Sequence, residues 1–196
     1  MDGVANLLVR TALTAGVPPG SIYVHSKLEL PGYFRPEKKW DFLVVHDGTL
    51  VAAAELKSQV GPSFGNNFNN RSEEAIGSGL DLVRAFQGKR KPMGRPPWRG
   101  WLILLEDTTR SRSKVKVSEV HFKVDPEFRD TSYADRYGEL CRRLVVDGLY
   151  TKSALMIAPR SPPGNYMEPD PALGLAPFLK SLAAACKPTA PSGPSS

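Results

Sequence analysis

Residues 41–57 read DFLVVHDGTLVAAAELK, and this stretch decides the fold. Two apolar runs flank Asp47-Gly48, a dipeptide that tolerates the positive φ angles of a tight hairpin turn. We therefore predict a β-hairpin with strands over 41–45 and 50–56. Glu55 interrupts the second apolar run, where a carboxylate costs free energy unless it is paired or bound to a metal.

Asp41, Glu55 and Lys57 form the pattern Asp-x13-Glu-x-Lys. Residues two apart in a strand share a face, so Glu55 and Lys57 point the same way, roughly 6.5–7 Å apart. Leu56 points into the core, and its carbonyl stays available. Mg²⁺ prefers one or two carboxylates together with water and phosphate oxygens. We predict that Asp41, Glu55 and the Leu56 carbonyl hold Mg²⁺ while Lys57 orients the attacking water, as in a nuclease.

The spacing alone recurs by chance, and the register of the hairpin tests this assignment. Directly opposed residues of two strands share a face. A simple two-residue turn puts Asp41 opposite Ala54, so that Asp41 faces away from Glu55. A three-residue loop with Gly48 left-handed, or an equivalent β-bulge, brings Asp41 to the face of Glu55. The metal site therefore requires the loop or the bulge.

Outside the hairpin, apolar spacing predicts the other elements of an α/β fold. The expected helices are 4–15, a helix capped by Asn70 or Ser72 that runs to Phe86, 133–146 and 171–186. The expected strands are 21–30, 101–105 and 154–158, and loops are expected over 61–70 and 89–100. This order predicts an α/β sandwich around a mixed central sheet flanked by helices. We expect one domain over 1–186 and a disordered Pro/Ser/Gly tail over 187–196.

The charge of the chain is concentrated in one stretch. The net charge is +6, and residues 89–123 hold ten Lys/Arg against three Asp/Glu, so the rest of the chain sums to about −1. A local basic stretch is typical of a protein that binds a polyanion. A solvated basic loop is the alternative.

The remaining composition predicts a cytoplasmic protein. Hydrophobic residues make up 41% of the chain, enough for a core, but no apolar run is long enough to cross a bilayer. The N-terminus does not have the residue order of a signal peptide. Cys141 and Cys186 fall in predicted helices, which favours two buried thiols over a disulfide. His25, His46 and His121 are scattered and do not form a zinc or histidine-based site.

Side chains that can recognise DNA follow Lys57 and recur in the basic stretch. Asn and Gln amides can read adenine edges, and Arg can read guanine or bind phosphate. An Asn/Gly turn chosen for its left-handed backbone is the alternative for 61–70. The predicted base-reading residues are Ser58, Gln59, Asn66, Asn67, Asn69, Asn70 and Arg71. The predicted phosphate contacts are Arg110, Arg112, Lys114 and Lys116.

Several longer runs resemble the XhoI family of type II restriction endonucleases. They are LPGYFRPEKKWDFLVV at 30–45, ELKSQVGPSFGNNFNNRSEEAIGS at 55–78, GWLILLED at 100–107, PEFRDTSYADRYGELCRRLV at 126–145 and the Ala-Pro-Arg of 158–160. The family is assigned to the PD-(D/E)xK nuclease fold. The resemblance places the motif's acids on Asp41 and Glu55 and its lysine on Lys57, with Trp40 in place of the name-giving proline. Many such enzymes also use an acid from the first helix, which here has none after Asp2.

The resemblance implies a restriction endonuclease that uses Mg²⁺ to cut both strands at a short palindrome, leaving 5′-phosphate and 3′-hydroxyl ends. Family members are known for the site CTCGAG. A palindromic site implies a homodimer on double-stranded DNA, and a cognate DNA methyltransferase acting on the same site is an implied partner. Two other classes stay open: a structure-selective or repair nuclease of the same fold, and a non-catalytic nucleic-acid-binding protein.

Overall fold

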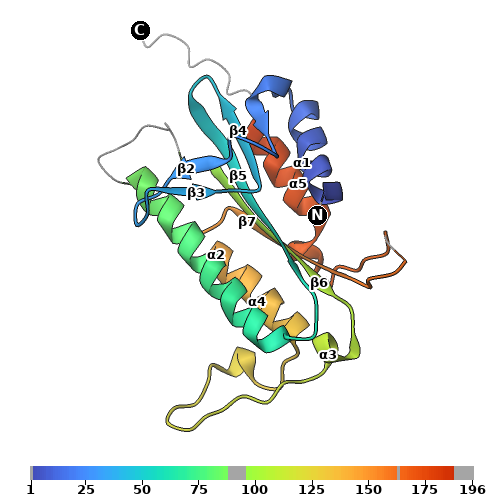
Figure 1. Ribbon diagram of the computed structural model, residues 1–196. Coiled ribbons are helices and arrows are strands. Elements are labelled where there is room, and N and C mark those ends of the chain that lie inside the picture. Colours follow the sequence, from blue (N-terminus) through green and yellow to red (C-terminus); the bar gives the residue numbers. More distant parts are fainter. Residues whose placement is uncertain (1, 88–95, 163, 188–196) are drawn as a thin grey trace.

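The computed structural model describes residues 2–87, 96–162 and 164–187 (Figure 1). Its centre is a five-stranded sheet in the order β1-β4-β5-β6-β7. The first three of these strands pair antiparallel, and β5, β6 and β7 pair parallel. The predicted mixed sheet is confirmed. Its strands are β1 Ile22–Tyr23, β4 Phe42–His46, β5 Thr49–Gln59, β6 Trp98–Glu106 and β7 Lys152–Ala158.

Helices cover both faces of the sheet (Figure 1). On one face lie α1 Asp2–Thr14 and α5 Leu175–Cys186; on the other lie α2 Phe64–Gln87 and α4 Tyr133–Val146. Four shorter pieces complete the helical structure: α3 Thr109–Arg112, η1 Pro19–Ser21, η2 Pro126–Phe128 and η3 Pro171–Leu173. Among the described residues, no helix combines the length and the apolar character needed to cross a membrane.

A second, two-stranded sheet packs at one end of α2 (Figure 1). Its strands β2 Glu29–Pro31 and β3 Glu37–Lys39 pair antiparallel. One strand over 21–30 was the prediction, and it was wrong, since that segment contains β1 and β2 as two short strands in different sheets. Lys27 between them has φ 56, a left-handed conformation that breaks the extended chain.

The hairpin of β4 and β5 turns in two residues. Asp47 and Gly48 have φ values of 48 and 71, as a tight hairpin turn requires, and His46 pairs with Thr49. The three-residue loop offered from the sequence is therefore wrong.

A β-bulge supplies the register change instead. The register shifts between Val44 and Val45, whose partners are Ala52 and Leu50, so Val51 is the extra residue. Continued to the end of β4, this register puts Asp41 opposite Glu55 and on its face. The bulge that the metal site requires is confirmed.

Helix α2 begins at Phe64, so the predicted loop over 61–70 and the cap at Asn70 or Ser72 were wrong. Asparagine and glycine disfavour a helix interior, but tertiary packing overrides this preference. Phe64 is buried and stacks on Tyr133 at 5.7 Å between centroids, and Phe68 meets Tyr137 edge-on at 5.0 Å. These contacts draw the Asn-rich residues into the first turns of the helix.

The other predicted elements differ only at their ends. Helix α4 has the predicted bounds, because Ser132 and Asp135 form a capping box at its start. Strand β6 begins at Trp98, so residues 98–100, at the end of the predicted loop over 89–100, belong to a strand instead. Residues 88–95 lie outside the described residues. Cys141 and Cys186 are buried and free, as predicted. The predicted tail lies outside the described residues except for Lys187.

Candidate active site

Asp41, Glu55 and Lys57 come together on the sheet face that α2 and α4 cover. The Lys57 ammonium lies 2.6 Å from Glu55 Oε2 and 3.8 Å from Asp41 Oδ2. The Leu56 N–H donates to Asp41 Oδ2 at 2.8 Å. In a strand, the N–H and C=O of one residue point toward the same neighbouring strand. The Leu56 carbonyl therefore points toward the side where Asp41 lies.

Glu55 is a buried carboxylate held by two lysines. Its side chain is 3% exposed, whereas that of Asp41 is 41% exposed. Lys38, on β3, forms an ion pair with Glu55 Oε1, the oxygen that Lys57 does not contact. Lys38 also lies over the Trp40 ring, 5.1 Å from its centroid. Sequence reasoning missed Lys38, although the basic and aromatic run just before Asp41 was the available signal.

The charges around Lys57 favour its protonated form. Burial on its own lowers the pKa of Lys57, but the Glu55 carboxylate, and after it Asp41 and Glu74, raise the pKa above its ordinary value. Lys57 is thus a cation shared by two acids.

These donors fit a magnesium ion. Two carboxylates from adjacent strands converge on one positive charge, and a backbone carbonyl points to the same side. Within the described ranges, no group of three or more His, Cys, Asp or Glu side chains is placed to hold a metal. Mg²⁺ is usually bound by one or two carboxylates and keeps several waters, whereas zinc prefers three or four His, Cys or acidic ligands. Two carboxylates therefore suit Mg²⁺ better than zinc.

Helix α2 carries an acid whose charge acts on Lys57. Glu74 raises the pKa of Lys57 and forms an ion pair with Arg71 at 2.6 Å. The first helix, α1, packs on the opposite face of the sheet and cannot contribute one there.

The chain was compared with known proteins. A model of the restriction endonuclease XhoI family matches residues 1–168. The chain belongs to the XhoI restriction endonuclease family. It is 47% identical over 189 residues to the type II restriction enzyme BstVI of Geobacillus stearothermophilus, covering 93% of this chain and 84% of that protein.

Two further relatives are also named as type II restriction enzymes. The type II restriction enzyme XhoI of Xanthomonas vasicola is 45% identical over 161 residues, which cover 81% of this chain and 65% of that protein. AbrI of Azospirillum brasilense, also a type II restriction enzyme, is 47% identical over 124 residues, or 63% of this chain and 56% of that protein. No solved structure matches the chain.

In this member of the XhoI family, the asparagines predicted to read bases lie on the first turns of α2. Asn66, Asn69 and Asn70 are exposed and share one face of the helix, since residues three and four apart are neighbours. Asn67 is half-buried, and Arg71 is paired with Glu74. A helix presents these amides as a fixed row.

The two residues after Lys57 differ from each other. Ser58 is exposed. Gln59 is 1% exposed; its amide oxygen accepts a hydrogen bond from the Tyr137 hydroxyl at 2.9 Å, and its amide nitrogen donates to the Val60 carbonyl. The predicted base contact of Gln59 does not suit this placement, because the side chain joins β5 to α4 in the core.

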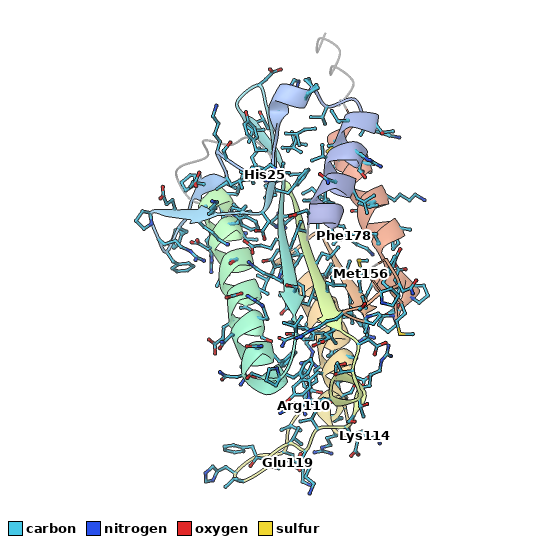
Figure 2. The ribbon with its side chains drawn as sticks, turned by 45° about the vertical axis from the view of Figure 1, so that its right-hand side comes forward. His25, Arg110, Lys114, Glu119, Met156 and Phe178 are labelled. Atoms are coloured by element: carbon cyan, nitrogen blue, oxygen red, sulfur yellow. The ribbon has the colours of Figure 1, made fainter. Side chains whose placement is uncertain are left out.

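The predicted phosphate contacts lie on and after α3, away from Asp41 and Glu55. Figure 2 shows Arg110 and Lys114 where the chain leaves the sheet for a projecting segment that also carries Glu119. Arg110, Lys114 and Lys116 are exposed, whereas Arg112 forms an ion pair with Asp107 at 2.7 Å. This basic group thus belongs to the segment after β6, whereas Glu55 lies on β5 and Asp41 just before β4.

Asp81 of α2 holds the β2–β3 turn in place. Its carboxylate accepts hydrogen bonds from the Tyr33 and Phe34 N–H groups at 2.7 and 2.8 Å and from Arg35 Nε at 2.7 Å. Asp81 is 2% exposed. Because the same hairpin carries Lys38, Asp81 also fixes the position of Lys38 above Glu55.

Low pH is expected to weaken the attachment of the β2–β3 turn to Asp81. Burial alone raises the pKa of Asp81, but the hydrogen bonds from Phe34, Arg35 and Tyr33 lower it below the ordinary value. The resulting stability is present above an unfolded-state pKa of about 3.9 and is lost as pH falls through the lower folded value. We expect Asp81→Asn to lower the melting temperature at pH 7 and to lessen its fall below about pH 4. Circular dichroism melts test this, and equal acid dependence in both proteins contradicts it.

Proposed function

We propose that this protein is a type II restriction endonuclease that makes Mg²⁺-dependent double-strand cuts at a short palindromic site. CTCGAG is the first site to test, and the products carry 5′-phosphate and 3′-hydroxyl ends. One observation supports the proposal most directly. Two carboxylates, Asp41 and Glu55, share Lys57 on one sheet face of a chain from a restriction endonuclease family.

Each residue of the site has a distinct role in this proposal. Asp41, Glu55 and the Leu56 carbonyl would hold Mg²⁺. When bound, Mg²⁺ offsets charge on the scissile phosphate and lowers the pKa of a bound water. Lys57 would orient a water for in-line attack on phosphorus, with the 3′-oxygen as the leaving group. The buried position of Glu55 keeps bulk water from competing for its carboxylate.

The proposed substrate is double-stranded DNA bound by a homodimer. A palindrome repeats the same half-site on each strand, so a two-fold symmetric dimer brings one copy of the site to each scissile bond. We assign base reading to the asparagine row of α2, and phosphate contacts to Arg110, Lys114 and Lys116. A cognate methyltransferase would protect the same site in host DNA.

Incubation with plasmid DNA and Mg²⁺ tests the proposal. We expect discrete fragments whose sequenced ends all lie within one palindrome, and no cleavage when EDTA removes the metal. Ends scattered over many sequences, or cleavage confined to branched DNA, would indicate a structure-selective or repair nuclease. Binding without cleavage at any Mg²⁺ concentration would indicate a non-catalytic protein.

A further inference from the structure

The turn between β2 and β3 exposes two adjacent aromatic side chains. Tyr33 is 59% exposed and Phe34 is 64% exposed. Their rings meet edge to face, with centroids 4.8 Å apart. Large aromatic side chains grouped on a surface mark a contact site, because they bury much area on binding at little entropic cost.

This turn is built into the fold. Asp81 accepts three hydrogen bonds from it, from Tyr33, Phe34 and Arg35. Gly32 is equally constrained, since a Cβ there would lie 2.5 Å from Asp81 Oδ2 and 2.8 Å from the Arg35 carbonyl oxygen. The backbone that carries the two rings is therefore fixed against α2 before any partner arrives.

The same hairpin reaches the candidate active site. Lys38 contacts Glu55, and Phe34 lies four residues earlier in the chain, in the turn before β3. Along α2, Asp81 lies about 10 Å from Glu74, the acid whose charge helps to raise the pKa of Lys57. Contacts of the same hairpin therefore connect the aromatic turn to Glu55 through Lys38 and to α2 through Asp81.

We propose that Tyr33 and Phe34 contact DNA next to the scissile phosphate, by packing against a base or sugar. The inference rests on the proposed function, because a phosphodiester at Lys57 carries its neighbouring nucleotides past this hairpin. Of the three cations in the hairpin, Arg35 is paired with Asp81 and Lys38 with Glu55, and Lys39 is exposed on β3, where its charge suits a polyanion. The rings add the stacking surface that bases accept whatever their sequence.

The test compares cleavage kinetics of the Tyr33→Ala/Phe34→Ala double variant with those of the unchanged protein, on a duplex containing the mapped cut site. We expect KM to rise about 10-fold or more, in line with the loss of one or two stacking contacts, while kcat changes less than about 3-fold. Leu13→Ala removes an exposed apolar side chain on α1, across the sheet, and serves as the matched control. Both variants should keep the melting temperature of the parent.

A second variant reports contact directly. Trp40, Trp98 and Trp101 are buried, so Phe34→Trp introduces an exposed indole. At concentrations where anisotropy shows the duplex to be bound, DNA should quench this indole and shield it from acrylamide. An unshielded indole, or an unchanged KM in the double variant, overturns the inference while the proposed function stands. A double variant that turns a dimer into a monomer overturns it in favour of a second copy of the chain. Failure of the unchanged protein to cut DNA refutes the proposed function instead.

Discussion

Asp41→Asn and Glu55→Gln are each expected to lower the rate of DNA cleavage by at least about 10³-fold. Both substitutions keep the shape of the side chain but remove a negative oxygen that would bind Mg²⁺. A bound metal contributes several kcal/mol of transition-state stabilisation, and each 1.36 kcal/mol corresponds to a factor of ten in rate. Binding of the duplex should remain, because phosphate contacts and base reading are assigned to other residues. Single-turnover cleavage and anisotropy measure the two quantities separately.

The two variants also separate chemistry from folding. Glu55→Gln leaves Lys38 and Lys57 around a neutral, buried amide, so this variant should melt at a lower temperature. Asp41 is 41% exposed, so Asp41→Asn should lose activity with little loss of stability. Asp47→Asn is the control, since it removes an 88% exposed carboxylate from the same hairpin at a turn position that Asn tolerates. Cleavage near the parent rate in Asp41→Asn would refute the metal assignment.

The hairpin and its acidic pattern could be predicted because their signals are local. A turn dipeptide between two apolar runs predicts the strands, and a carboxylate inside one run indicates a site. The position of the bulge could not be predicted in this way. Residues 50–54 are all apolar, so their alternation does not indicate which residue is unpaired, and only the requirement that Asp41 share a face with Glu55 called for a bulge.

Long-range packing decided the features that sequence reasoning missed. The start of α2 depends on Phe64 and Phe68 packing against α4, some 65 residues away in the chain, and not on the helix preference of the asparagines. Lys38 reaches Glu55 from the β2–β3 hairpin, whose turn Asp81 holds against α2. Gln59 was predicted to read bases, but its amide oxygen accepts a hydrogen bond from the Tyr137 hydroxyl in the core. In each case the deciding partner belongs to an element that is distant in sequence.

Two lysines contact the two oxygens of Glu55, and replacing each by Met is expected to have different effects. Lys57 lies 2.6 Å from Glu55 and 3.8 Å from Asp41, and we propose that it orients the attacking water. Lys57→Met should therefore lower kcat about 10²–10⁴-fold at every Mg²⁺ concentration, the range expected for a lost proton-handling group. Glu55 keeps Lys38 as a partner in this variant, so the melting temperature should change little.

Lys38 contacts Glu55 alone and approaches it from β3, so its charge competes with a metal for the same carboxylate. Lys38→Met should keep kcat within about 10-fold of the parent at saturating Mg²⁺, since Lys57, the lysine proposed to orient the water, remains. The Mg²⁺ concentration for half-maximal cleavage should fall, because one cation no longer occupies Glu55. Lys38→Arg restores the charge and should restore the parent Mg²⁺ dependence. Metal titrations of the cleavage rate in all four proteins measure these effects. Equal loss of kcat in Lys38→Met and Lys57→Met would instead show that both lysines act on the reacting atoms.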